Sequence, residues 1–158
     1  MTSSKKKFTL FLILSLLVLA FIFYNSTTTG EESNAASRGL MDFVLNIIDP
    51  HGKLDTTVFH YLVRKGAHFA EYFVYGFCLF GMPLAIREET KKLYVSLTLL
   101  IAMSSAVIDE IIQSFTSRTS SPRDVLLDFI GASCGVLFMW LVHRGREKRK
   151  ARKTEANK

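Results

Sequence analysis

The stretch from Arg64 to Tyr72 carries charged and polar side chains at the start of an otherwise apolar run, Phe73 to Ile86. Runs of that kind belong in lipid, where a charged side chain near the bilayer centre costs roughly 2.5–3.5 kcal/mol on insertion scales. Charged groups placed there must find partners elsewhere in the chain or serve a ligand. The chemistry of this protein is therefore expected to depend on the groups that meet Arg64–Tyr72.

Two further groups of polar residues lie at the ends of later apolar runs. They are Asp109, Glu110 and Gln113 in one run, and Asp124 and Asp128 in the next. Residues three or four apart share one face of a helix, so His68 and Glu71 face the same way, as do Asp109 and Gln113. Asp109 and Glu110 are adjacent and cannot both face the bundle centre. One is expected to face inward and the other to meet a neighbouring helix.

Carboxylates in different environments can act as a general acid and a general base. The candidates for catalysis are His68, Glu71, Asp109, Glu110 and Asp128. A divalent metal held by His68 with Glu71, Asp109 or Glu110 is a further hypothesis, and whether the protein has a cofactor is left open. The serines lack the sequence context of an activated nucleophile. Whether the protein is an enzyme stays undecided at this stage.

Basic side chains beside these acids suit a phosphorylated or zwitterionic headgroup. The full set of ligand-binding candidates is Arg64, Lys65, His68, Glu71, Tyr72, Asp109, Glu110, Gln113, Arg118, Arg123, Asp124 and Asp128. Three structural alternatives stay open. The network could only tie the helices together, Asp124 could be a helix N-cap, and Tyr72 and Tyr75 could be packing residues. Proton or ion translocation is a weaker alternative, because the ionisable groups of the spans all lie at one end.

The elements that position these residues are apolar helices. The chain has 158 residues, 49% of them hydrophobic, and the apolar residues gather in four blocks. We predict an all-α polytopic membrane protein with four transmembrane helices at about 8–24, 68–86, 93–115 and 125–142. The membrane domain covers 8–143, between a basic N-terminus (1–7) and a basic tail (144–158). The first run fits an uncleaved helix better than a signal peptide, and Cys78 and Cys134 fit packing residues better than a disulfide.

Short interfacial helices are predicted in the loop before the second span. Leu40–Ile48 is apolar enough to lie on the membrane surface, and a second helix starts at Asp55 or Thr56 and leads into Arg64. Within the fourth span, the small residues of 131–135 allow close packing against a neighbouring helix.

Charge predicts which way the helices cross the membrane. Four spans put both termini on one side, together with the loop 87–92, and that side holds 14 of the 20 Lys and Arg residues. The positive-inside rule therefore places both termini in the cytoplasm of a multi-pass protein of the cell membrane. The net charge of +6 reflects these basic ends and not nucleic-acid binding. The three polar groups then converge near the outer leaflet, as an outward-facing polar pocket.

The three polar blocks resemble the VanZ-like family of small bacterial membrane proteins. The matching motifs are R-K-x-x-H-F-x-E-Y (64–72), D-E-x-x-Q-x-F-x-x-R (109–118) and D-V-x-x-D-x-x-G-A-x-x-G (124–135). Their order and spacing are more specific than any one block, although Thr-Ser stands before Arg118 where the family often has Pro-Gly. The family's namesake is associated with low-level teicoplanin resistance, so the resemblance implies an accessory protein of the cell envelope.

The polar residues and the resemblance together give two functions to compare. In the first, the pocket binds lipid-linked cell-wall precursors or lipoglycopeptides and contributes to teicoplanin-type glycopeptide resistance. In the second, the protein is a membrane-embedded enzyme that acts on a lipid-linked envelope substrate by carboxylate or metal chemistry. The lipid bilayer is the partner that the sequence requires, whereas the oligomeric state is not predicted.

Overall fold

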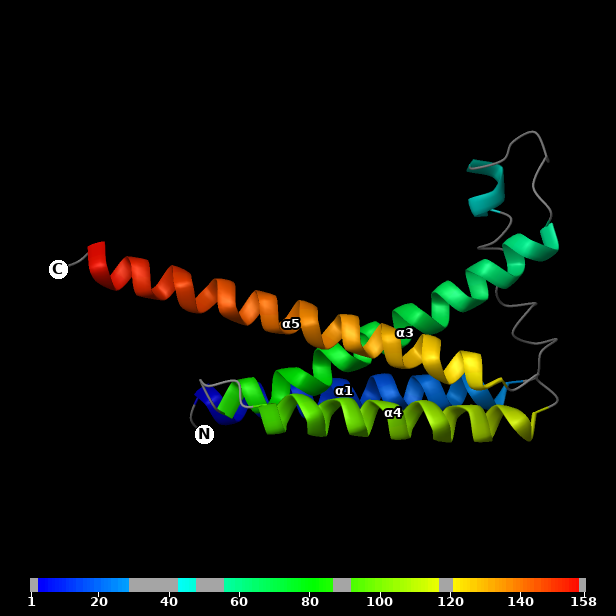
Figure 1. Cartoon of the computed structure of the whole chain (residues 1–158), viewed down its shortest axis with the longest axis horizontal. Helices are drawn as coiled ribbons and strands as arrows, with labels where there is room; N and C mark the ends of the chain where they lie inside the picture. The colour runs from blue at the N-terminus through cyan, green and yellow to red at the C-terminus, as the bar shows by residue number, and fades with distance from the viewer. Residues whose placement is uncertain (1–2, 29–42, 48–55, 87–91, 117–120, 157–158) are drawn as a thin grey trace.

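Four long helices dominate the computed structural model (Figure 1), which describes residues 3–28, 43–47, 56–86, 92–116 and 121–156. They are α1 (Ser3–Thr27), α3 (Thr56–Ile86), α4 (Lys92–Ser114) and α5 (Pro122–Ala156). Each is long and apolar enough to cross a bilayer. The described residues contain no strand, so the predicted all-α, four-span architecture is confirmed. The chain is a multi-pass membrane protein.

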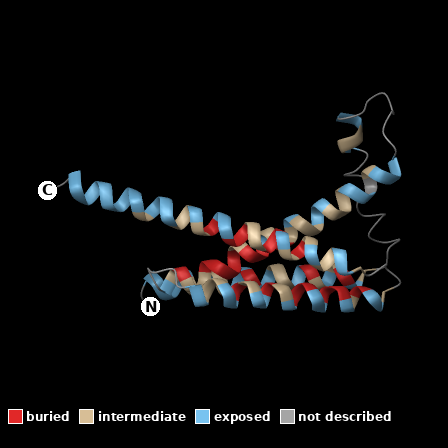
Figure 2. Ribbon diagram, in the orientation of Figure 1, coloured by how far each residue is buried: buried red, intermediate tan, exposed pale blue. Residues whose placement is uncertain are grey.

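The helix α3 differs from the prediction in being continuous. We expected a surface helix that feeds a separate span at His68, but α3 runs unbroken from Thr56 to Ile86. The glycine at 66 does not break it, since a single glycine costs a helix only about 1 kcal/mol. The first turns of α3 extend away from the other helices and are largely exposed (Figure 2). Of the predicted helix Leu40–Ile48, the structure describes residues 43–47, which are helical.

The helices α1 and α5 both continue beyond the predicted spans. α1 runs on to Thr27, so Asn25 and Ser26 belong to a helix and not to a loop. α5 begins at Pro122, where the missing N–H of proline is harmless. Ser121 caps this helix, because its Oγ accepts a hydrogen bond from the Arg123 amide at 3.3 Å. The N-cap hypothesis for Asp124 is therefore wrong, since Asp124 lies inside the first turn.

The helix α3 lies at the centre of the bundle and packs chiefly against α5 and α1. The crossing of α3 and α5 is close because glycines lie at the contact. A Cβ atom at Gly131 would stand 2.6 Å from the carbonyl oxygen of Phe69, and one at Gly135 would stand 2.8 Å from the amide nitrogen of Phe77. The predicted close packing through small residues is confirmed.

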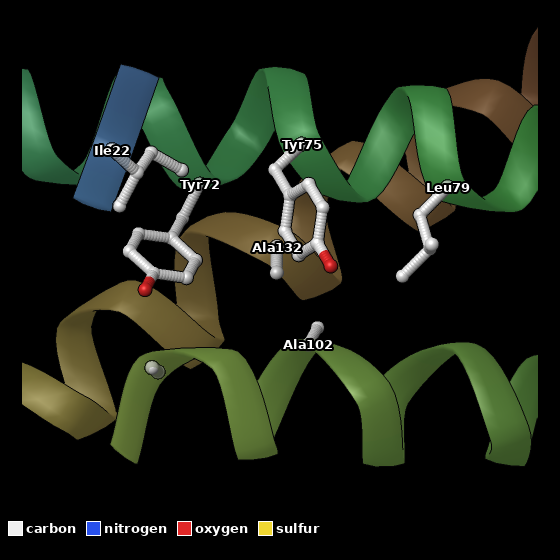
Figure 3. Packing of buried hydrophobic residues seen from close by; sticks show 7 residues of the cluster. Ile22, Tyr72, Tyr75, Leu79, Ala102 and Ala132 are labelled. Carbon is white, nitrogen blue, oxygen red and sulfur yellow. The ribbon is translucent and has the colours of Figure 1, made fainter. Parts of the chain in front are cut away.

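All four helices contribute to one apolar core (Figure 3). Its buried members are Ile22 of α1, Tyr72, Tyr75 and Leu79 of α3, Ala102 and Ala106 of α4, and Ala132 of α5. The Tyr75 hydroxyl lies 3.1 Å from Ser105 Oγ, which satisfies it within the core. Cys78 and Cys134 are free thiols, so the packing role predicted for them holds. This core ties the four helices together at the level where the polar residues begin.

Candidate functional site

Three carboxyl side chains are buried at one end of the bundle, where α1 and α4 end and α5 begins (Figure 1). Asp109 is 0%, Asp128 1% and Glu110 5% exposed. Four other acids, Asp109, Glu110, Asp124 and Glu71, act on the Asp128 carboxyl with like charge. Gathering like charges in an apolar bundle is costly. This arrangement therefore needs a cause other than stability.

Asp109 is fixed by two side chains. Ser26 Oγ, from the last turn of α1, donates a hydrogen bond to Asp109 Oδ1. Gln113 Nε2 donates to Asp109 Oδ2 at 3.0 Å and to Ser26 Oγ at 3.3 Å. The i,i+4 spacing of Asp109 and Gln113 predicted this shared face. The carboxylate of Asp109 is thereby oriented toward α1.

Glu110 points the other way, toward the start of α5. Its Oε2 accepts a hydrogen bond from the Ser121 amide at 3.0 Å. Its Oε1 is buried and has no hydrogen-bond partner within the described segments. The sequence predicted that one of these acids faces inward and the other meets a neighbouring helix. Asp109, which is fully buried and bonded to Ser26, is the inward acid, and Glu110 meets the start of α5.

His68 and Glu71 lie one turn apart on α3. His68 Nδ1 stands 4.0 Å from Glu71 Oε2, and Asn25 Nδ2 donates to Glu71 Oε1 at 2.9 Å. Both α3 side chains are only partly buried. A second helix-to-helix contact is the ion pair between Lys65 and Asp124, which joins α3 to α5. Lys65 is therefore already engaged by an acid of the chain itself.

The histidine and two of the buried acids converge on one point. His68, Asp109 and Asp128 each offer one potential ligand atom, and these atoms all lie within 4.8 Å of one another. The hydroxyl of Tyr72 is buried beside them, in the field of the Asp109 and Asp128 charges. We call this group of four residues, His68, Tyr72, Asp109 and Asp128, the polar cluster. It joins α3, α4 and α5.

Comparison with known proteins identifies the family of the chain. The family model VanZ/LLP1 matches residues 11–143, which is most of the chain. The chain belongs to the VanZ/LLP1 family. No curated protein and no solved structure matches it. All four residues of the polar cluster lie inside the part that matches the VanZ/LLP1 model, so the cluster is part of the family domain.

Some predicted site residues of this VanZ/LLP1 protein make no described contact with the acids. Arg64 is half-buried and Arg123 exposed, and neither forms an ion pair with an acid that the structure describes. Arg118 lies outside the described residues, so its place in the site stays a prediction. Whether the acids and the basic residues enclose an open pocket also stays a prediction.

Sequence reasoning missed Asn25 and Ser26, which supply hydrogen bonds to Glu71 and Asp109. A signal for them existed. These two residues directly follow the first apolar run, and four alternating crossings bring the end of the first span beside the start of the second. The hydrogen bonds add α1 to the helices that hold the site.

Proposed function

We propose that this VanZ/LLP1 protein is an accessory protein of the bacterial cell envelope, acting at the cytoplasmic membrane. Its polar cluster would recognise the polar headgroup of a lipid-linked cell-wall precursor or of a lipoglycopeptide. Through that contact it would contribute to teicoplanin-type glycopeptide resistance.

One observation carries this proposal. Asp128 is 1% exposed, and neither of its carboxylate oxygens has a hydrogen-bond partner among the residues described. An unsatisfied buried polar group costs about 1–3 kcal/mol, and more when it is charged. Polar contacts between membrane helices contribute only about 0.6 kcal/mol on average. A role in holding the helices together does not explain why Asp128 is buried without hydrogen bonds. A ligand that forms the missing hydrogen bonds does explain it.

The position of the cluster supports a headgroup as the ligand. The charge pattern of the chain predicts that this end of the bundle faces outward, because the opposite end carries most of the Lys and Arg residues. Lipid headgroups and the sugar and peptide parts of cell-wall precursors lie at that level. Carboxylates accept hydrogen bonds, so the acids of the cluster suit amino and hydroxyl groups of such a ligand.

The proposal predicts a resistance phenotype that depends on Asp128. Deleting the gene should increase susceptibility to teicoplanin, and the wild-type gene should restore the original minimal inhibitory concentration. Asp128→Asn keeps the shape of the side chain but removes its charge, and it should complement no better than an empty vector. The measurement is broth dilution, with immunoblots of the membrane fraction to establish equal amounts of protein.

Glu147→Gln is the matched control. It also removes one carboxylate from α5, but Glu147 lies in the basic tail and pairs with Lys150 at 2.7 Å, remote from the cluster. This variant should complement like wild type. If Asp128→Asn also complemented fully, or if deletion left susceptibility unchanged, the proposal would be wrong.

A membrane-embedded enzyme is the second candidate, and one observation favours it. Asp109 accepts two hydrogen bonds from side chains, while Asp128 accepts none from the described residues. Acids in such unlike environments can divide the roles of acid and base. An enzyme would convert a lipid-linked envelope substrate in a reconstituted assay and lose turnover in Asp109→Asn. Binding without any product would instead favour the accessory role.

A further inference from the structure

We propose that the polar cluster binds one divalent transition-metal cation, of the Zn²⁺ or Mn²⁺ type. The proposed ligands are His68 of α3, Asp109 of α4 and Asp128 of α5, whose potential ligand atoms lie within 4.8 Å of one another. One imidazole nitrogen with two carboxylates is a donor set that such ions accept. An all-oxygen site would favour Mg²⁺ or Ca²⁺ instead.

The distances need only a small adjustment to fit an ion. Metal–ligand bonds of roughly 2.0–2.2 Å place neighbouring ligand atoms about 3.3 Å apart. Because the three potential ligand atoms lie within 4.8 Å of one another, each separation would close by at most about 1.5 Å on binding, which small rotations of the side chains supply. All three ligands are on helices that the α3–α5 glycine contact and the apolar core hold together. The backbone therefore already has the spacing of the site.

Two buried groups without partners point into this position. Both oxygens of Asp128 and the hydroxyl of Tyr72 lack a hydrogen-bond partner among the described residues, and the two side chains are 1% and 0% exposed. Tyr72 directs its hydroxyl away from α3 and toward α4 and α5 (Figure 3). A cation would give Asp128 the opposite charge that a buried carboxylate requires. Tyr72 would contact the ion or a water molecule bound to it.

The surroundings of the ligands are those of a supported metal site. Metal-binding side chains are usually oriented by hydrogen bonds from a surrounding layer of residues. Ser26 and Gln113 hold the two oxygens of Asp109. Glu71 stands 4.0 Å from His68 Nδ1 and is itself held by Asn25. Asp109 thus has neighbours that orient it, and Glu71 lies beside His68 at a distance longer than a hydrogen bond.

A bound cation would change which ligands the cluster accepts. Without an ion, Asp128 is surrounded by other acids, whose negative charges repel phosphate. A divalent ion offsets that charge and can itself coordinate a phosphate oxygen. This last step rests on the proposed function, and it narrows the headgroup to a phosphorylated lipid or precursor. The metal binding does not depend on it.

The test is metal binding by the full-length purified protein in detergent, after removal of ions with a chelator. Calorimetric titration with Zn²⁺, Mn²⁺ and Mg²⁺ should show one site that prefers Zn²⁺ or Mn²⁺ over Mg²⁺. Asp128→Asn and His68→Gln should each weaken binding by about tenfold or more. Co²⁺ should give a visible absorption band in wild type that both variants lose. Glu147→Gln should bind like wild type.

The outcomes separate this inference from the proposed function. If wild type binds none of these ions, or if Asp128→Asn and His68→Gln bind like wild type, the metal site is wrong. A loss of binding in Glu147→Gln would assign the ion to the tail and also overturn it. Circular dichroism and gel filtration check that each variant folds. If Asp128→Asn does not fold, the Co²⁺ spectrum of His68→Gln decides whether the metal site exists. A teicoplanin phenotype without metal binding would leave the proposed function standing.

Discussion

At the scale of single residues, the charged groups of this membrane bundle differ in how they are stabilised. Lys65 and Asp124 neutralise each other, and their side chains are only 15% and 16% exposed. Asp128, one turn further along α5, has the charges of other acids around it. The first pair behaves as a structural contact between α3 and α5. A ligand would add the most stabilising contacts at Asp128.

The ion pair predicts a coupled effect on stability. Lys65→Met should leave the carboxylate of Asp124 without its cation and lower the free energy of unfolding by about 1–3 kcal/mol. The double variant with Asp124→Asn should lose less than the sum of the two single variants, because the charge left unpaired by the first change is then absent. Denaturant unfolding of the purified protein measures all three variants. Additive losses would show that the two side chains do not stabilise each other.

The residue contacts also show where prediction from the sequence stops. Helical spacing predicted that Asp109 shares a face with Gln113, and their hydrogen bond agrees. The spacing could not decide whether Asp109 or Glu110 faces inward, because that depends on how the whole helix is rotated. The partnership with Ser26 joins positions that are 83 residues apart, and only the packed bundle brings them together.

At the scale of helices, the close crossing of α3 and α5 sets the spacing of the cluster. His68 and Tyr72 approach Asp128 because Gly131 and Gly135 let the backbone of α5 lie directly against α3. A larger side chain at this contact would push the two helices apart. The helices would remain, but the distances within the cluster would grow.

Two alanine substitutions on α5 test this role of the crossing. At Gly135 the new Cβ would meet the backbone of Phe73 and Phe77, so Gly135→Ala should lower the unfolding free energy by about 1–3 kcal/mol. At Gly145 nothing lies within 4 Å, so Gly145→Ala should be neutral or slightly stabilising. The midpoint temperature of thermal unfolding in detergent, measured for both variants and wild type, distinguishes the two effects. Equal stability of the two variants would contradict the role of the crossing.

The extents of the helices were only partly predictable. Apolar length identified all four spans, since a helix needs about 20 apolar residues to cross lipid. It could not locate the ends of α1 and α5, because helical hydrogen bonds continue into polar sequence where nothing breaks them. The predicted spans therefore stopped at residues 24 and 142, whereas α1 runs to Thr27 and α5 to Ala156.

At the scale of the whole molecule, the two ends of the bundle differ in character. One end carries the buried acids and the other carries the N-terminal lysines and the basic part of α5, which projects beyond the other helices (Figure 1). Basic residues near the ends of spans favour the cytoplasmic side. The cluster is then expected to face the outer leaflet.

Cysteine labelling tests this orientation. In a variant with Cys78→Ala and Cys134→Ala, a single Thr56→Cys should react with a membrane-impermeant maleimide in intact cells. A single Gly145→Cys should react only after lysis, because the basic end should lie in the cytoplasm. Both positions are exposed on their helices, so access to the reagent depends on the side of the membrane. The reverse pattern would place the cluster at the inner leaflet.

The contact between α1 and the acids has a consequence for how the protein is made. Helices enter the membrane in chain order during synthesis, the N-terminal ones first. Asn25 and Ser26 of α1 precede their acids Glu71 and Asp109, and Lys65 of α3 precedes Asp124 of α5. In each pair the polar partner is inserted before the carboxylate arrives. The donor or cation of each pair is thus in the membrane before its acid. Loss of α1 would remove the hydrogen bonds that Glu71 and Asp109 receive from Asn25 and Ser26.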